Sequence, residues 1–252
     1  MIIFIIPYRD RENQKIFFNR HMKEVILEDL AEGEDYELLF IHQNDKREFN
    51  RGAMRNIGFL VVKSLYPEKY KEITLVFNDV DIMPYKKDYL NYETKEGEIK
   101  HYYGTKSTLG GIISIKGKDF EKIDGYPNFW TWGGEDNIIQ IRAIKKRLKI
   151  NRDEFHYYYD KEILSLNDGT NRNMYKSGIN NLTSSHEDDG LSKIKGLKYN
   201  KRKEGNISIV DVNNFEAKYK APKKDEMIEV DVKKAKPKLD LSPIKMNNIL
   251  RY

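Results

Sequence analysis

Two acidic residues follow an apolar segment at a spacing that suits a metal ion. Asp79 and Asp81 lie in "NDVDIMP", directly after the apolar run 73–77 and before Pro84. Carboxylate oxygens are hard ligands that suit Mg²⁺ or Mn²⁺, and Mg²⁺ sites commonly include the phosphates of a substrate. The pattern therefore predicts a metal and phosphate site, or else a solvated loop that carries two acids.

Three arginines stand close to predicted turns of the chain. Arg9 and Arg11 follow the first apolar run in "PYRDR", and Arg51 lies in "FNRGAMRN". Planar, fork-shaped guanidinium groups of this kind bind diphosphates through paired hydrogen bonds. Taken singly, each arginine is also explained as surface charge. Phe49, close to Arg51, would either stack on a base or pack in the core.

The segment "NFWTWGGEDN" (128–137) contains both tryptophans of the chain, a glycine pair and two acids. The indole of Trp132 offers a flat apolar face with an N–H group, which suits a sugar ring. Glu135 and Asp136 would open a helix, where backbone N–H groups favour the ionised carboxylate, and such a carboxylate can accept a proton from a sugar hydroxyl. The glycines suit a hinge that lets the indole move over a substrate. The alternative is a capped helix with both tryptophans in the core.

The elements that would position these residues alternate along the chain. We predict strands at 2–6, 36–41, 73–77, 110–115 and 207–212, and helices at 12–30, 52–66 and 135–149. Such alternation indicates an α/β fold with a mixed, mostly parallel sheet flanked by helices. Because the carboxyl ends of parallel strands line one crevice, the motifs that follow these strands should converge there.

The composition indicates a globular protein with a heavily charged surface. The 252 residues are 39% hydrophobic and 34% charged, and the chain has no cysteine. This excludes disulfides and thiolate-based metal sites. No run approaches the ~18 apolar residues of a membrane span, and the opening "MIIFII" is too short for a signal peptide. We therefore expect a cytoplasmic protein without a membrane span.

The positive charge is concentrated at the carboxyl end. The net charge is +5, and residues 216–252 hold ten Lys/Arg against six Asp/Glu, which is +4 of that excess. We predict a domain at 1–215 and a basic, extended tail at 216–252. A folded nucleic-acid-binding protein would carry its excess on the body, so nucleic acid is an unlikely partner. Nucleic-acid binding through the tail alone is a weaker alternative.

The order of these motifs resembles that of the β-1,4-galactosyltransferase family. The resemblance covers roughly residues 2–212 and is carried by "PYRDR", "FNRGAMRNIGF", "DVDIMP", "LGG", "DGYPNFWTWGGED" and the late "DDGLSKIKGLKYN" with "ISIVDV". Of these, "WTWGGED" is the most specific. The resemblance implies a GT-A fold, a UDP-sugar donor, a Mn²⁺ ion (or Mg²⁺) and inversion at the anomeric carbon.

The resemblance also implies roles for single residues. The donor and its metal would be bound by Pro7, Arg9, Arg11, Phe49, Arg51, Asp79, Val80, Asp81, Thr108 and Trp132. Among these, Asp81 would be the metal ligand, and Trp132 would cover the donor. The acceptor would be held by Gly134, Glu135, Asp136 and Asn137. Asp136 would be the catalytic base.

The sequence departs from the family pattern beside the donor and acceptor sites. Asn137 stands where the family has a third acid, which leaves the acceptor open. Thr108 stands where an aromatic residue is common, and Leu109 where phenylalanine is common. In galactose-specific relatives a tyrosine beside the 2-position of the donor sugar limits what fits there. Thr108 is smaller, so an N-acetyl group should be admitted.

A third departure concerns the metal. The family has a metal-binding histidine where this chain reads "ILSLNDG", so Ser165 or Asn167 takes its place. His156 and His186 lie on either side, and the alternatives for each are a substitute metal ligand or, more often for a lone histidine in polar sequence, a surface residue. We therefore expect weaker metal binding than in relatives that have the histidine.

Together these observations predict a metal-dependent, inverting glycosyltransferase. It would move galactose or N-acetylgalactosamine from a UDP-sugar to a hydroxyl of a glycan or glycoprotein acceptor. Because the metal-binding histidine is missing, the alternative is a catalytically silent module that binds a nucleotide sugar.

Overall fold

The computed structural model describes residues 1–166, 169, 171–176 and 188–231. In these segments the strands are β1 (Ile2–Tyr8), β2 (Tyr36–Gln43), β3 (Thr74–Asn78), β4 (Ile82–Pro84), β5 (Glu98–Gly104), β6 (Ile112–Lys116), β7 (Lys149–Asn151), β8 (His156–Tyr157), β9 (Ile163–Ser165), β10 (Asn171–Tyr175), β11 (Lys195–Glu204), β12 (Ile207–Glu216) and β13 (Met227–Asp231). The helices are α1 (Glu12–His21), the π-helix η1 (Met22–Ile26), α2 (Arg51–Leu65), α3 (Gly117–Lys122), α4 (Glu135–Lys145) and the short 3₁₀ helices η3 (Leu191–Lys193) and η4 (Lys224–Glu226). None of these helices is long and apolar enough to pass through a membrane.

One large mixed sheet organises the described chain. Its strands follow the order β11-β12-β2-β1-β3-β6-β5-β7, and β8 pairs with β5. The pairs of β1 with β2 and β3, of β2 with β12, and of β5 with β7 and β8 are parallel. Strand β6 is antiparallel to both of its neighbours, and β11 is antiparallel to β12. The predicted α/β fold with a mostly parallel, mixed sheet is confirmed.

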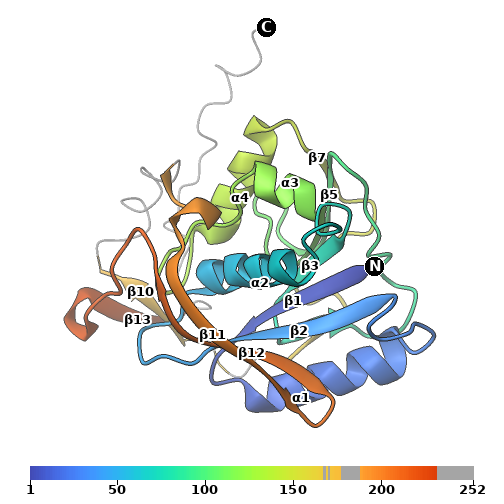
Figure 1. The fold of residues 1–252 in the computed structure, drawn as a ribbon, viewed down its shortest axis with the longest axis horizontal. Coiled ribbons are helices and arrows are strands. Elements are labelled where there is room, and N and C mark those ends of the chain that lie inside the picture. The colour runs from blue at the N-terminus through green and yellow to red at the C-terminus, as the bar shows by residue number, and fades with distance from the viewer. Residues whose placement is uncertain (167–168, 170, 177–187, 232–252) are drawn as a thin grey trace, which may run out of the picture.

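Helices cover both faces of this sheet. Helix α1 lies on one face, and α2, α3 and α4 lie on the other (Figure 1). Each face has its own apolar core, one containing Phe18 of α1 and the other Ile57 of α2. All seven residues of β1 are buried, which explains why a strand between two helical layers reads as a continuous apolar run.

Several elements differ from the predicted ones. The predicted helix at 12–30 is α1 followed by the π-helix, and it ends at Ile26. The predicted strand at 110–115 is β6, which begins at Ile112 and runs antiparallel to β3. Strands β5 and β11 were not predicted, because "EIKHYYG" and "KGLKYNKRKE" have no simple apolar period. Strand β11 is mostly exposed, so its pairing depends on the backbone of β12 rather than on burial.

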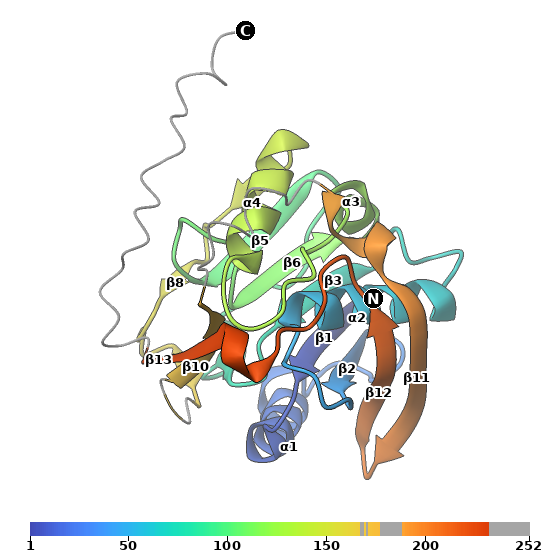
Figure 2. The same ribbon diagram turned by 90° about the vertical axis from the view of Figure 1, so that its left-hand side faces the viewer.

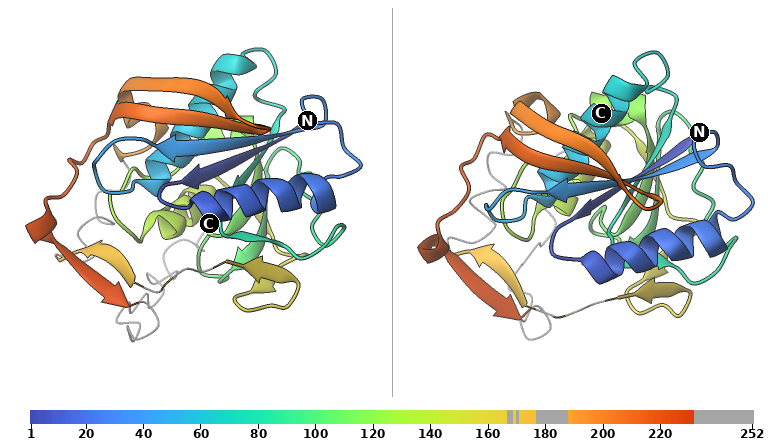
Figure 3. Two further views of the ribbon diagram at one scale, coloured as in Figure 1. Left: turned by 90° about the horizontal axis from the view of Figure 1, so that it is seen from below. Right: turned by 60° about the horizontal axis from the view of Figure 1, so that its bottom comes forward.

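Part of the segment that the sequence assigns to a tail is a strand. Residues 227–231 form β13, which pairs antiparallel with β10 in a separate two-stranded sheet. This pair stands apart from the β11–β12 hairpin and from the large sheet (Figures 2 and 3). The boundary predicted at residue 215 stays a prediction, and residues 232–252 lie outside the described residues.

A close contact sets the position of α2 against the loop that precedes the tryptophans. Gly52 lies in the first turn of α2, and a Cβ atom placed on it would lie 2.0 Å from the carbonyl oxygen of Pro127. Backbone atoms cannot move aside as the end of a flexible side chain can. Glycine therefore allows the start of α2 to approach this loop.

We expect Gly52→Ala to lower the free energy of unfolding by about 1–3 kcal/mol or more, the usual cost of overpacking a filled site. Urea denaturation followed by circular dichroism would measure it. Ser64→Ala, at an exposed position of the same helix, is the matched control and should change stability by less than about 0.5 kcal/mol. Equal stability of the two variants would show that α2 does not depend on this contact.

Candidate functional site

A cleft of about 580 Å³ opens where β1 and β3 end. Most of the predicted site residues line it, namely Pro7, Arg9, Arg11, Phe49, Arg51, Asp79, Val80, Asp81, Trp132 and Glu135. They come from four segments that are far apart in the sequence. The carboxyl ends of the parallel strands therefore bring these motifs together.

Four predicted residues do not line this cleft in the described part of the chain: Thr108, Gly134, Asp136 and Asn137. Asp136 follows Glu135 in the first turn of α4, and its side chain is 19% exposed. Both of its carboxylate oxygens bond to arginines of α2. The predicted base is therefore joined through Arg51 to the residues that line the cleft, and its side chain is partly exposed.

Arg51 is the centre of a network of ion pairs. Its Nη1 donates to Asp79 at 3.0 Å, its Nη2 to Asp136 at 2.8 Å, and its Nε to Glu135 at 2.8 Å. These carboxylates stand at the end of β3 and the start of α4. One guanidinium group therefore ties three elements of the fold together.

A second arginine completes the network, and the sequence analysis did not identify it. Arg55 is 1% exposed and donates to Asp136 at 2.8 Å and to Asp79 at 2.6 Å. Its guanidinium also lies 4.6 Å from the ring centre of Tyr126. The available signal was spacing: Arg51 and Arg55 are four residues apart, and such residues share one face of a helix.

The network controls ionisation. Burial alone would raise the pKa of Asp136, but Arg51 and Arg55 outweigh it, so the pKa lies below the ordinary value of 3.8. Burial alone would lower the pKa of Arg51, and its carboxylate partners raise it well above the ordinary value. Asp136 is therefore ionised at neutral pH, as an acceptor for a proton must be.

Local backbone features hold Asp136 in place. The side chain of Asn50 accepts a hydrogen bond from the backbone of Ala53 and so caps α2 directly before Arg51. Gly134 precedes α4 with φ of 90°, a left-handed conformation that glycine adopts without strain. A Cβ on Gly110 would lie 2.6 Å from Oδ2 of Asp136, so a larger residue there would displace the carboxylate from its present position.

A buried histidine supports the segment that contains Gly110. The Nε2 atom of His101 lies 3.0 Å from the carbonyl oxygen of Tyr103 and 3.1 Å from that of Gly110, and Arg152 donates to its Nδ1. Burial, with the charge of Arg152, lowers the pKa of His101 to about 4. His101 is therefore neutral, and its Nε2–H donates to these carbonyl oxygens. The sequence analysis did not identify this residue.

The two tryptophans have different environments. Trp130 is 2% exposed, stacks on Phe215 with 5.4 Å between ring centres, and donates from Nε1 to the carbonyl oxygen of Tyr219. Trp132 is 39% exposed and lines the cleft. The core interpretation is correct for Trp130, whereas Trp132 is free to contact a ligand.

The cleft contains a carboxylate suited to a cation. Burial, together with the nearby charge of Asp79, raises the pKa of Asp81 to about 6. Such a shift means that the negative charge of Asp81 is poorly compensated, and a bound cation would compensate it. Ser165 pairs with Ile82 across β4 and β9, and Leu166 donates to the carbonyl oxygen of Asp81 at 2.7 Å. The segment that would hold the family histidine therefore lies beside Asp81.

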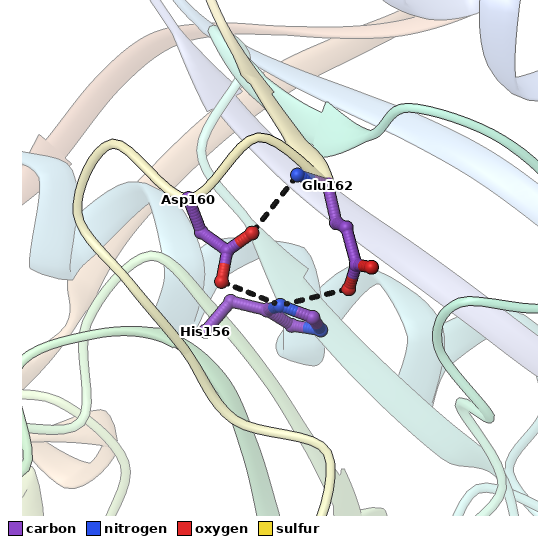
Figure 4. A group of neighbouring side chains, drawn as sticks. All are labelled: His156, Asp160 and Glu162. Atoms are coloured by element: carbon purple, nitrogen blue, oxygen red, sulfur yellow. Dashed lines mark hydrogen bonds and ion pairs between the residues drawn. The ribbon is translucent and has the colours of Figure 1, made fainter.

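His156 lies in a cluster of its own. Its Nδ1 is 3.2 Å from Oδ2 of Asp160 and 3.5 Å from Oε2 of Glu162 (Figure 4). Unlike Asp81, His156 does not line the described cleft. Contacts with two acidic side chains account for this histidine. Asn167 and His186 lie outside the described residues.

A tyrosine that the sequence analysis did not identify also lines the cleft. Tyr158 packs edge-to-face on Tyr103, and its hydroxyl is 3.8 Å from where a Cβ on Gly104 would lie. Burial, with the charges of Asp136 and Asp79, raises its pKa to about 12. The only signal was the run of three tyrosines at 157–159. Thr108 lies in the loop after Gly104, and its hydroxyl is 3.3 Å from that of Thr105.

The structure is similar to solved galactosyltransferases. It matches Drosophila β-1,4-galactosyltransferase 7, solved as a mutant in complex with manganese, UDP-Gal and xylobiose, with a TM-score of 0.63 and 19% identity over 87% of this chain and 94% of that one. The catalytic domain of the same enzyme with xylobiose matches with a TM-score of 0.62 and 21% identity. The fold is therefore GT-A, as predicted.

The sequence is similar to curated galactosyltransferases over about 60% of its length. Human β-1,4-galactosyltransferase 4 is 29% identical over 161 residues, 60% of this chain and 44% of that protein. The mouse protein is 31% identical over 162 residues, with the same coverage. Xylosylprotein 4-beta-galactosyltransferase of Caenorhabditis elegans is 29% identical over 59% of this chain and 52% of that protein. The chain thus spans about half the length of the curated relatives it matches.

Two family models match consecutive parts of the chain. The N-terminal region of glycosyl transferase group 7 matches residues 1–95, and the model described as the N-terminal domain of galactosyltransferase matches residues 93–163. Together they cover residues 1–163, well over half of the chain. The chain therefore belongs to the β-1,4-galactosyltransferase family.

Proposed function

We propose that this protein is a metal-dependent glycosyltransferase that moves galactose, or N-acetylgalactosamine, from a UDP-sugar to a hydroxyl of a glycan acceptor with inversion. The observation that carries the proposal is the cleft, which unites basic, acidic and aromatic residues from four motifs beside an ionised Asp136. The fold and the family of the chain support it, as does the Drosophila relative solved with UDP-Gal and manganese.

The residues of the cleft suit each part of such a donor. Phe49 offers a ring to the uracil base, and Arg9 and Arg11 offer guanidinium groups to the diphosphate. Trp132 offers an exposed indole to a sugar ring. Asp81 would hold Mn²⁺ or Mg²⁺, which when bound would neutralise charge on the departing diphosphate.

The reaction requires one proton acceptor. The oxygen of the acceptor hydroxyl bonds to the anomeric carbon from the face opposite the diphosphate, and the bond from that carbon to the diphosphate oxygen breaks. Asp136 takes the hydroxyl proton. Each of its oxygens receives one hydrogen bond from arginine, and a carboxylate oxygen has a second lone pair for this proton.

Release of UDP tests the proposal. We expect UDP release from UDP-galactose or UDP-N-acetylgalactosamine in the presence of Mn²⁺, stimulated by one member of an acceptor panel. Binding of UDP without turnover would instead identify a silent nucleotide-sugar-binding module. Linkage analysis of the product by NMR would show whether the anomeric centre is inverted.

We expect Asp136→Asn to lower turnover by ~10²-fold or more, the range usual for a lost general base. The variant keeps the size of the side chain but removes the proton acceptor, so UDP affinity should be largely kept. Initial rates and calorimetric titration with UDP measure the two effects. Asp153→Asn, at an exposed acid, is the matched control. Near-normal turnover of Asp136→Asn would exclude Asp136 as the base.

We expect Asp81→Ala to abolish the increase in UDP affinity that Mn²⁺ produces, because the protein's carboxylate ligand is lost. Calorimetric titrations with UDP, with and without Mn²⁺, measure this change. In the wild type we expect Mn²⁺ to bind more weakly than in relatives with the metal-binding histidine. Tight Mn²⁺ binding that depends on His156 or His186 would contradict that expectation.

We expect UDP-N-acetylgalactosamine to be used at least comparably to UDP-galactose, because Thr108 is small and its hydroxyl could bond the amide. Thr108→Tyr should shift the preference toward galactose by roughly 10–200-fold in kcat/KM, the range for pocket contacts of this size. Tyr158, which lines the cleft near Gly104, is the competing determinant.

Comparison of kcat/KM for both donors in the wild type, Thr108→Tyr and Tyr158→Ala separates the two residues. A wild type that strongly prefers galactose, unchanged in Thr108→Tyr but relaxed in Tyr158→Ala, would assign donor choice to Tyr158.

A further inference from the structure

The two-stranded sheet of β10 and β13 forms a wall of the cleft. Asn171 and Asn173 of β10 line it, as does Glu229 of β13. Asn173 lies directly opposite Glu229 in the antiparallel register. Directly opposed residues lie on the same face of a sheet, and alternate residues of one strand share that face. One polar face of this sheet is therefore turned toward the cleft.

This wall is attached to the tryptophan segment. The backbone N–H of Trp132 donates to the carbonyl oxygen of Asn173 at 3.0 Å, and the amide of Asn173 donates to Glu48 at 3.2 Å. Tyr175, at the end of β10, packs against the main apolar core. The position of the exposed indole is thereby linked to that of β10.

The C-terminal segment is attached to the same loop from its other side. After β12, Tyr219 accepts the hydrogen bond from the indole of Trp130 and packs its ring against Phe129. The chain then reaches β13. The backbone N–H of Lys176, which follows β10, donates to the carbonyl oxygen of Glu226 at 2.9 Å. Residues 219–231 thus run from the contact with Trp130 to β13, which lies beside β10 at a distance from the β11–β12 hairpin (Figure 2).

The chemistry of this wall differs from that of the arginine-bearing part of the cleft. The two amide side chains both donate and accept hydrogen bonds and the carboxylate accepts them, and sugar hydroxyls can take either part in such bonds. Glu229 forms no ion pair within the described part of the chain, and a carboxylate would repel a diphosphate. Arg172 also lines the cleft, and its guanidinium donates to the backbone oxygens of Gly169 and Asn171, as Arg9 and Arg11 donate to backbone oxygens of Arg47 and Asp10.

We infer that β13 completes the acceptor side of the cleft, and that Asn171, Asn173 and Glu229 bind hydroxyls of the acceptor sugar beside Trp132. This inference rests on the proposed function and adds a segment that the motifs did not include. It assigns the start of the basic C-terminal segment to the sugar site rather than to a free tail.

A first experiment compares point variants. The probe is the sugar that most stimulates UDP release from UDP-galactose among xylobiose, xylose, glucose and N-acetylglucosamine. We expect Glu229→Ala to raise KM for this sugar by roughly 10-fold or more, as for a lost hydrogen bond to a charged group. UDP affinity should be kept, and Glu229→Gln should restore part of the loss. Asp225→Ala, at an exposed acid of the same segment, is the matched control.

A second experiment compares two truncations, residues 1–231 and residues 1–226. The first keeps β13 and the second removes it, whereas both lack the basic residues beyond 231. We expect the longer chain to keep the wild-type KM for the sugar and the shorter chain to lose stimulation by it, with UDP binding retained. Circular dichroism checks that both chains fold.

The outcomes separate the inference from the proposed function. A wild-type protein that does not bind UDP would overturn the proposed function itself. A wild type that binds UDP and is stimulated by the sugar, with an unchanged KM in both Glu229→Ala and residues 1–226, would overturn this inference alone. Equal loss in residues 1–231 and 1–226 would assign the effect to the residues beyond β13 and would also overturn it.

Discussion

The ion pairs that Arg51 and Arg55 form with three carboxylates are the interaction on which the site depends. They join α2 to the end of β3 and to the start of α4, and Arg55 is almost fully buried. Removing one partner of such a buried network typically costs 3–5 kcal/mol, because the remaining charge is left unpaired. The network therefore fixes the separation of these elements, and with it the position of Asp136. Two glycines leave room beside this network: Gly110 next to the carboxylate of Asp136, and Gly52 next to the carbonyl oxygen of Pro127.

The sequence predicted those parts of the fold that burial determines. Strands β1, β2 and β3 lie between two helical layers, so their apolar runs are continuous and easy to identify. Strand β11 is exposed along most of its length, and β13 pairs with a strand more than 50 residues earlier in the chain. Strand β11 pairs with the next strand, β12, and β13 pairs with a distant one. Both pairings depend on backbone hydrogen bonds, which side-chain patterns do not encode. The sequence could indicate neither strand, and the C-terminal segment therefore resembled a tail.

The site was predictable where motifs follow buried strands. The ends of β1 and β3 bring Arg9 and Asp81 into one cleft, as the topology of parallel strands requires. The residues that the sequence missed act through partners distant in the chain. Arg55 gains its role from Asp79 and Asp136, and Tyr158 is positioned by Tyr103 and Gly104 at the end of β5. An arginine or a tyrosine in the sequence does not indicate a functional site until its partners in the fold are known.

Most N–H groups of Arg51 already bond to carboxylates of the protein. This limits which residues could neutralise the charge of a bound diphosphate. Its Nε, Nη1 and Nη2 atoms each bond to a different carboxylate, so few of its five N–H groups remain for a ligand. A diphosphate bound in this cleft would therefore rely on Arg9 and Arg11, together with a cation at Asp81. The five-residue network itself holds two positive and three negative charges, and Asp81 adds another negative charge beside it. This excess favours a divalent cation in the cleft, while Arg51 holds one oxygen of Asp136 and helps to keep it ionised. Arg51 would then contribute to the reaction through the base rather than through the phosphates, a role that its place in the motif did not reveal.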